Sequence, residues 1–158
     1  YGNVIGSRGS VVPFFKEKKK DGALPITDIR MTRFWITLEE AVEFVIKNLD
    51  RMIGGEIFIP KIPSMKIIDL ANVIGPDCKI KIIGIRPGEK LHETMISSDD
   101  SRNTIQLQDC YIITPEFDWW DKNKYVNSKP VPKDFEYNSY SNDIFLTDKE
   151  MEKIVNNY

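Results

Sequence analysis

The sequence predicts a mixed α/β fold, because two kinds of apolar pattern alternate along it. Short runs rich in Val, Ile and Phe, which favour strands, are separated by segments in which apolar residues recur every three or four positions, as on one face of a helix. The chain has 158 residues, of which 41% are hydrophobic and 29% charged. That length and apolar content suit a globular domain with a buried core, and they exclude a disordered or fibrous protein.

In the first part of the chain, the expected elements are recognised by their caps and turns. They lie at residues 4–5 (strand), 11–20 (helix), 23–28 (strand), 34–36 (apolar run) and 38–52 (helix). Ser10 is placed to cap the first helix, which Gly22 follows. Thr37 and Glu40 have the spacing of a capping box, and the helix after them repeats apolar residues on one face.

The alternation of strand and helix continues to residue 115. The expected elements are residues 56–59 (strand), 65–74 (helix), 79–85 (strand), a short helical stretch ending near 96, and 106–114 (strand). From residue 116 to 142 the chain has no periodicity and is rich in polar residues and aromatics, which predicts an extended arm. Thr147 and Glu150 form a second capping box for a final helix. We therefore expect an α/β region over 1–115 and an arm with a last helix over 116–158.

Charge, hydropathy and cysteine content limit the location and the partners. The formal net charge of -2 gives no field that would attract nucleic acid, and no apolar run approaches the roughly 20 residues that span a bilayer. Cys78 and Cys110 lie far apart with no further ligands at metal spacing, so we expect two reduced thiols in a cytoplasmic protein. Since the sequence opens within a strand pattern and without Met, residue 1 is not expected to be the natural beginning.

Two arginines are candidates for binding a diphosphate. Arg86 follows an expected strand and precedes Pro87 and Gly88, a turn that brings the backbone and a guanidinium close to a ligand. Pairing of Arg86 with Glu89 or Asp99 on the surface is the alternative. Arg33, at the edge of the run 34–36, either points into the same cleft or faces water. Glu89 either accepts from ribose hydroxyls or favours the start of a helix.

Other polar residues have more ordinary interpretations. Asn3 could contact a sugar hydroxyl or a pyrophosphate, although Asn more commonly forms turns. His92 is the only histidine, which favours packing over metal binding. Tyr125 and Lys129 match a Tyr-x-x-x-Lys spacing, but Pro130 and the irregular surroundings argue against a helix there. There is no Gly-x-Gly-x-x-Gly fingerprint for a dinucleotide pyrophosphate.

Four blocks together resemble the second half of the inverting UDP-N-acetylglucosamine 4,6-dehydratases, which are extended short-chain dehydrogenases/reductases of pseudaminic acid and capsular sugar synthesis. The blocks are 1–13 (YGNVIGSRGSVVP), 26–35 (ITDIRMTRFW), 58–65 (FIPKIPSM) and 86–93 (RPGEKLHE). The resemblance covers almost the whole chain. It implies the end of a Rossmann sheet followed by a smaller α/β substrate-binding domain.

The resemblance also implies a role for each matched residue. Asn3, Arg33, Arg86 and Glu89 would bind UDP-N-acetylglucosamine, with the arginines at the diphosphate and Glu89 near the ribose. Five residues would line the nicotinamide side of NADP: Val4, Ile5, Gly6, Ser7 and Arg8. The family oxidises the sugar at C4, eliminates water across C5 and C6 and returns the hydride at C6, with inversion at C5.

The glycine-rich loop and the catalytic residues of this family precede the match to residue 1, so no catalytic residue is assigned in this chain. The resemblance implies that the chain alone neither binds NADP properly nor turns over, and that it needs an amino-terminal Rossmann half. A homo-oligomer is expected, as is an apolar edge at Val4 and Ile5 that is exposed unless another chain covers it. Two alternatives stay open: another nucleotide-sugar epimerase or dehydratase of the superfamily, and a non-catalytic sugar-nucleotide-binding or oligomerisation module.

Overall fold

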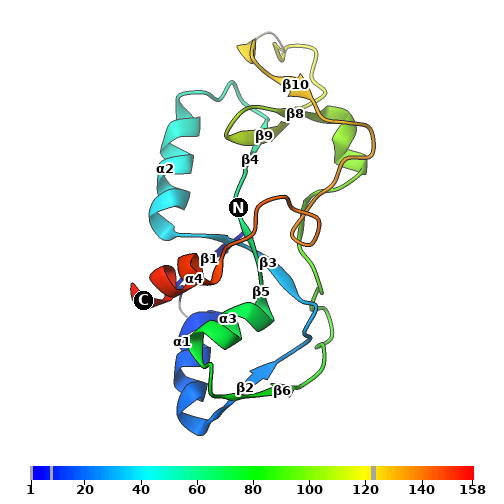
Figure 1. Ribbon diagram of the computed structural model, residues 1–158. Coiled ribbons are helices and arrows are strands. Elements are labelled where there is room, and N and C mark those ends of the chain that lie inside the picture. The colour runs from blue at the N-terminus through cyan, green and yellow to red at the C-terminus, as the bar shows by residue number, and fades with distance from the viewer. Residues whose placement is uncertain (1, 8, 122–123) are drawn as a thin grey trace. The chain divides into compact units, whose positions relative to one another are not determined.

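The structure is a computed structural model that describes residues 2–7, 9–121 and 124–158 (Figure 1). It confirms the predicted α/β fold. The chain forms two compact units. Unit 1 contains residues 38–61 and 94–138, and unit 2 contains residues 2–37, 62–93 and 139–158. The predicted arm is thus divided between the units at residue 138; the assignment of sugar-nucleotide binding to 1–115 stays a prediction.

Unit 2 contains two small sheets and three α-helices. Its elements are β1 (Asn3–Val4), α1 (Val11–Lys18), a 3₁₀ helix (Lys19–Asp21), β2 (Ala23–Ile26), β3 (Thr32–Ile36), β5 (Ser64–Lys66), α3 (Ile67–Ile74), β6 (Lys79–Ile82) and α4 (Asp148–Asn156). The sheet order is β1-β3-β5, in which β1 is parallel and β5 antiparallel to β3. Strands β2 and β6 form a separate parallel pair.

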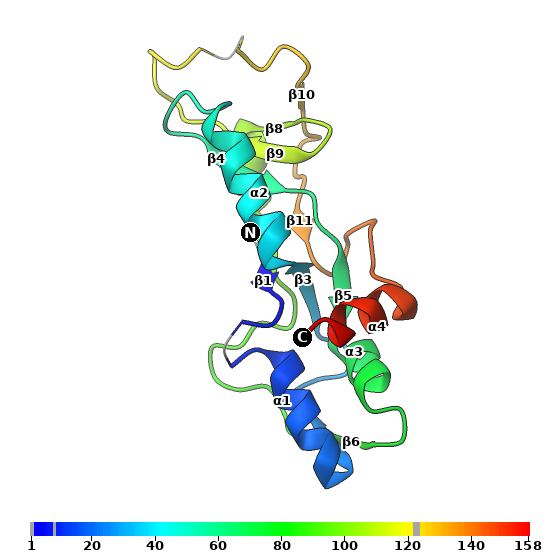
Figure 2. The same cartoon turned by 90° about the vertical axis from the view of Figure 1, so that its left-hand side faces the viewer.

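The core of unit 2 lies between its helices and these strands. Phe15 of α1, Leu24 of β2 and Leu70 of α3 are almost completely buried, as is Met151 of α4. Helices α3 and α4 lie side by side in both views (Figures 1 and 2). The capping box of α4 is formed, since Thr147 and Glu150 each accept a hydrogen bond from the other's backbone N–H, which confirms the predicted helix start.

The amino-terminal strand β1 lies at the edge of its sheet, where β3 is its partner, but the side chain that directly follows it is buried. The side chain of Ile5 is 3% exposed and belongs to the core of unit 2. Its backbone N–H donates to the carbonyl of Ile36 at 3.0 Å, directly after the pairing of β1 with β3. The expectation of an exposed apolar edge at Val4 and Ile5 is therefore wrong for Ile5, whose side chain packs in the core of the same unit, whereas Val4 is half-buried.

Unit 1 is built around a four-stranded sheet. Its elements are α2 (Leu38–Leu49), β4 (Ile57–Pro60), β7 (Thr94–Ile96), a 3₁₀ helix (Asp99–Asn103), β8 (Thr104–Gln106), β9 (Cys110–Ile113), β10 (Lys129–Pro130) and β11 (Tyr137–Asn138). The sheet order is β10-β8-β9-β4, and all its pairs are antiparallel. Strands β7 and β11 form an antiparallel pair of their own.

Helix α2 forms as predicted, but its apolar face is not buried by the described residues. Leu38, Ile46 and Leu49 are 56%, 59% and 60% exposed. The buried residues of α2 are Ala41 and Asn48. The periodicity therefore predicted the helix correctly, whereas in this structure most of the apolar face is open.

Three sequence-based assignments of secondary structure are corrected by long-range pairing. Residues 65–66 belong to β5, which pairs with β3, so the helix begins at Ile67 rather than at 65. The helical stretch expected to end near residue 96 is wrong, because Thr94–Ile96 is strand β7 paired with β11. The single strand expected at 106–114 is a hairpin of β8 and β9. For β5 and β7 the deciding partner is remote in sequence, so local patterns do not reveal it.

The irregular segment after residue 115 places aromatic side chains in the core of unit 1. Trp120 and Tyr125 are buried in a cluster with Cys110 and Ile112. The Tyr125 hydroxyl donates to Glu56 at 3.0 Å, and Tyr125 lies outside the helices. Its burial and its bond to the Glu56 carboxylate raise the pKa of the phenol. The interpretation of the Tyr125–Lys129 spacing as non-catalytic is consistent with this packing.

Both cysteines are free thiols. Within the described residues, no helix has the length and apolar content needed to cross a bilayer, and no group of His, Cys, Asp and Glu side chains is placed to hold a metal ion.

Asp109 provides a test of how unit 1 is held together. It follows β8 and accepts from Arg51 at 2.8 and 3.2 Å, and it forms an ion pair with Lys47 at 2.7 Å. The hydrogen bonds from Arg51 hold the pKa of the Asp109 carboxyl well below its usual range. An Asp carboxyl has a pKa of about 4 in the unfolded chain. Because its pKa is lower in the folded protein, Asp109 stabilises the fold fully above about pH 4, and this contribution is lost progressively as the pH falls from there toward the folded-state pKa.

We expect Asp109→Asn to lower the free energy of unfolding by roughly 1–2 kcal/mol at pH 7, because a partly exposed charged network is disrupted. The difference from the wild type should narrow between about pH 4 and pH 3. Urea unfolding across this range checks both statements, with the exposed Asp77→Asn as the control. A difference that does not change with pH would contradict the assigned role of the carboxylate.

Candidate functional site

A cavity of about 500 Å³ lies within unit 2 and gathers residues that are distant in the sequence. All four predicted substrate-binding residues line it, namely Asn3, Arg33, Arg86 and Glu89. Its walls are completed by Val4, Ser7, Gly9, Ser10, Val11, Val12, Phe14, Phe15, Pro25, Ile26, Thr27, Met31, Trp35, Met65, Ile67 and Ile83. The cavity therefore combines a mostly apolar wall with a few polar groups, which is the usual composition of a small-molecule site.

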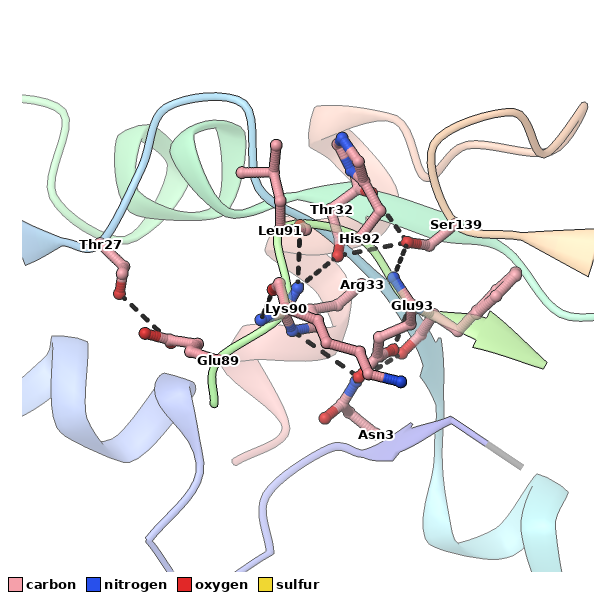
Figure 3. A network of polar contacts seen from close by, with 11 residues as sticks. Asn3, Thr27, Thr32, Arg33, Glu89, Lys90, Leu91, His92, Glu93 and Ser139 are labelled. Atoms are coloured by element: carbon pink, nitrogen blue, oxygen red, sulfur yellow. Dashed lines mark hydrogen bonds and ion pairs between the residues drawn. The ribbon is translucent and has the colours of Figure 1, made fainter. Parts of the chain in front are cut away.

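Arg33 projects from β3, and its guanidinium is used mainly by the protein itself. Nη1 donates to the carbonyls of Thr32 at 2.7 Å and Leu91 at 3.1 Å, and Nη2 donates to the carbonyl of Lys90 at 2.8 Å (Figure 3). Nε lies 3.6 Å from the Glu93 carboxylate. The side chain is 15% exposed. Arg33 thus holds the segment 90–93 against β3 and has little donor capacity left for a bidentate ligand.

Arg86 has the opposite character. Its side chain is exposed and makes no hydrogen bond or ion pair with any described residue. The turn that carries it is formed as predicted, with Gly88 at φ 80°. The contact between Arg86 and Glu89 runs from the backbone N–H of Arg86 to the Glu89 carboxylate at 3.2 Å, so the predicted alternative of a guanidinium ion pair does not form. No described residue occupies the guanidinium donors of Arg86, so as far as the structure describes the chain they are available to an anion.

Glu89 is fixed by two hydrogen bonds. Its carboxylate accepts from the backbone of Arg86 and, at 3.4 Å, from the hydroxyl of Thr27. No helix follows Glu89, because Thr94–Ile96 is strand β7. The alternative of Glu89 as a charge at a helix N-terminus is therefore wrong.

A second polar chain lies behind Arg33. Nδ1 of His92 is 2.8 Å from the Thr32 hydroxyl, which is 2.8 Å from the Ser139 hydroxyl. Ser139 also accepts from the backbone N–H of Glu93 at 2.9 Å. The His92 ring packs on Tyr140 with centroids 4.7 Å apart. Burial and the charge of Arg33 lower the pKa of His92. The packing role expected for His92 is confirmed, although it does not lie on a helix.

The residues predicted for the nicotinamide side are only partly accessible. Val4 and Ser7 line the cavity, whereas Ile5 points into the core. Gly6 has φ 71°, and a Cβ atom there would overlap the ring of Tyr158. Arg8 lies outside the described residues. The conformation and the crowding at Gly6 both require glycine.

Glu93 was missed by sequence reasoning. Its carboxylate oxygens each lie 2.9 Å from Nδ2 of Asn3, and one accepts from the backbone N–H of Phe34 at 3.2 Å. Glu93 therefore connects β1, β3 and the segment that carries Arg86. Its only sequence signal is its place at the end of the block 86–93, which does not reveal these partners.

Comparisons with known proteins show which family this chain resembles. Residues 1–115 match the family described as polysaccharide biosynthesis protein. The chain is 54% identical, over 99% of its length, to the inverting UDP-N-acetylglucosamine 4,6-dehydratase of Campylobacter jejuni subsp. jejuni serotype O:2. It covers 49% of that relative. It is also 41% identical, over 72% of its length, to 35% of a UDP-glucose 4-epimerase of Rickettsia canadensis.

The X-ray structure of Pen from Bacillus thuringiensis is similar over 99% of this chain and 48% of Pen, with a TM-score of 0.84 and 32% sequence identity. This likeness confirms the predicted fold class, the C-terminal part of an extended short-chain dehydrogenase/reductase. The chain spans about half the length of the curated dehydratases that it matches.

The different roles of the two arginines predict different effects on stability. We expect Arg33→Ala to lower the free energy of unfolding by about 2–3 kcal/mol, because three carbonyls and Glu93 lose their donor. Arg86→Ala should change it by less than about 0.5 kcal/mol, as for an exposed side chain without partners. Urea unfolding of the two variants beside the wild type measures both changes. An equal loss in the free energy of unfolding in Arg33→Ala and Arg86→Ala would show that Arg33 does not anchor the segment 90–93.

Proposed function

Because this chain belongs to the polysaccharide biosynthesis protein family, we propose that it is the UDP-sugar-binding portion of an inverting UDP-N-acetylglucosamine 4,6-dehydratase. The observation that carries the proposal is the cavity of unit 2, which unites Asn3, Arg33, Arg86 and Glu89 from separate parts of the chain. The identity of 54% to a dehydratase over nearly the whole chain supports the choice of activity.

The diphosphate contacts Arg86 in this proposal. An arginine fork forms two parallel charge-assisted hydrogen bonds with phosphate oxygens, and the guanidinium of Arg86 is unpaired among the described residues. Arg33 contributes positive charge to the same wall while it holds the backbone at residues 90 and 91. Glu89 accepts from the ribose hydroxyls, since a carboxylate has acceptor capacity beyond its bonds to Thr27 and Arg86.

NADP is the proposed cofactor of the complete enzyme, in which it supplies the hydride chemistry at the sugar. Val4 and Ser7 line the cavity and fit a role beside the nicotinamide. Ile5 and Gly6 determine the path of the backbone there. The Ile5 side chain is buried, and Gly6 lies so close to the Tyr158 ring that a Cβ atom would overlap it. These four residues allow close approach by a flat ring but provide no cradle for the pyrophosphate.

An amino-terminal Rossmann half is the proposed partner within the complete protein. The apolar face of α2 supports this proposal, since Leu38, Ile46 and Leu49 are more than half exposed. Relatives about twice as long as this chain contain a further region of similar size. The predicted homo-oligomer, the cytoplasmic location and the pseudaminic acid or capsular pathway stay predictions.

A UDP-sugar 4-epimerase is the second candidate, because of the 41% identity to the Rickettsia protein. That match covers 72% of the chain, compared with 99% for the dehydratase. Both activities use a UDP-sugar, so the cavity serves either. The reaction product separates them.

We expect the full-length protein with NADP to convert UDP-N-acetylglucosamine into a 4-keto-6-deoxy sugar that has lost one water. Mass spectrometry detects this loss, and proton NMR assigns the configuration at C5. An epimerase would instead give a product of unchanged mass. Unreacted UDP-N-acetylglucosamine in the presence of NADP would contradict both activities.

Arg86→Ala in the full-length protein should weaken UDP binding about ten- to hundredfold, because a bidentate charged contact is removed. Arg86→Lys should restore only part of the affinity, since lysine lacks the planar fork. Titration calorimetry with UDP measures these affinities, and Arg102→Ala in unit 1 is the control for a general loss of positive charge. Unchanged affinity in Arg86→Ala would remove Arg86 from the diphosphate site.

A further inference from the structure

Asn3 is held so that its amide nitrogen faces the protein. Nδ2 donates to the carbonyl of Phe34 at 3.2 Å and lies 2.9 Å from each carboxylate oxygen of Glu93. These partners only accept hydrogen bonds, so the opposite amide orientation would place Oδ1 against a carbonyl and a carboxylate. The protein itself therefore determines the orientation of the Asn3 amide.

The group that Asn3 leaves available is consequently its oxygen. Both N–H bonds of Nδ2 are directed at protein acceptors, and no described residue donates to Oδ1. Asn3 is exposed and lines the cavity, and its oxygen points away from Glu93 in Figure 3. An amide oxygen accepts from an O–H or N–H group, whereas a phosphate oxygen offers it no proton.

The charged groups beside Asn3 and beside Arg86 differ in the same way. Beside Asn3, the carboxylate of Glu93 is paired with the guanidinium of Arg33, 3.6 Å away. The Arg86 guanidinium has no such partner among the described residues. A diphosphate gains more from the unpaired cation, whereas Asn3 offers a neutral acceptor.

We propose that Asn3 is a specificity-determining residue that accepts a hydrogen bond from the sugar, through a hydroxyl or the acetamido N–H, and that Glu93 is the positioning residue that presents it. This inference rests on the proposed function, because it requires that the cavity bind a UDP-sugar. It assigns the sugar to Asn3 and the diphosphate to Arg86. Glu93 acts on the ligand through Asn3.

The test compares Asn3→Ala, Glu93→Gln and the double variant in the full-length protein, by titration calorimetry with UDP, UDP-glucose and UDP-N-acetylglucosamine. Asn3→Ala should weaken the binding of UDP-N-acetylglucosamine about tenfold, as expected for the loss of one hydrogen bond. It should change the affinity for UDP by less than about twofold. Glu93→Gln replaces one acceptor oxygen with an N–H₂ group that opposes the N–H groups of Asn3 and Phe34. Glu93→Gln should give a similar loss of affinity, again confined to the two UDP-sugars and not shared by UDP.

The double variant separates positioning from general support of the fold. If Glu93 acts through Asn3, the double variant binds UDP-N-acetylglucosamine no more weakly than Asn3→Ala. Additive losses would overturn the positioning role. If Glu93→Gln does not fold, as a thermal melt would show, Asn3→Ala still tests the acceptor role, because its exposed side chain leaves the core unchanged.

The outcomes distinguish the inference from the function on which it rests. A selective loss for UDP-N-acetylglucosamine identifies the acetamido N–H as the donor, and equal losses for both UDP-sugars identify a hydroxyl; both support the proposal. The inference alone is overturned if Asn3→Ala weakens the binding of UDP as strongly as that of the UDP-sugars. It is also overturned if Asn3→Ala weakens the binding of none of these ligands. A wild-type protein that binds neither UDP nor a UDP-sugar overturns the proposed function and the inference with it.

Discussion

The hydrogen bonds of Arg33 to the carbonyls of Lys90 and Leu91 are the interaction on which the site depends. Residues 86–93 form neither helix nor strand, so no backbone ladder determines where they lie. Single backbone bonds from Thr32 to Leu91 and from Ser139 to Glu93 hold part of the segment. Arg33 adds side-chain bonds from a strand that is itself paired on both sides, with β1 and with β5. A planar guanidinium suits this task because its donors diverge in fixed directions.

Glu93 extends the same constraint to the amino-terminal strand. Its carboxylate sits between Nδ2 of Asn3, the backbone N–H of Phe34 and the Arg33 guanidinium. Each of these groups is a donor, so the carboxylate is satisfied by the protein and its charge is offset nearby. The result is a polar wall of the cavity whose donors and acceptors are paired with one another. Among the described residues the Arg86 guanidinium has no partner, which is the state that favours an incoming anion.

The fold was predictable wherever local patterns were sufficient. The helices at α1, α2 and α4 follow from caps and apolar periodicity, and strands β2 and β4 follow from short apolar runs. Two of the misassigned segments, β5 and β7, are those whose state depends on a distant partner. Strand β7 exists because β11 pairs with it from more than 40 residues away, and local sequence around Thr94 is equally compatible with a helical turn.

The candidate site shows the same division. The sequence by itself determined the family and the residue types of the site, because Asn3, Arg33, Arg86 and Glu89 stand in blocks with a recognisable order. It could not distinguish the two arginines, since the difference lies in their partners. Only the tertiary structure decided that Arg33 is occupied by carbonyls and Glu93, while no described residue pairs with the Arg86 guanidinium. The physical reason is that a side chain's donors are assigned by the groups that folding brings around it.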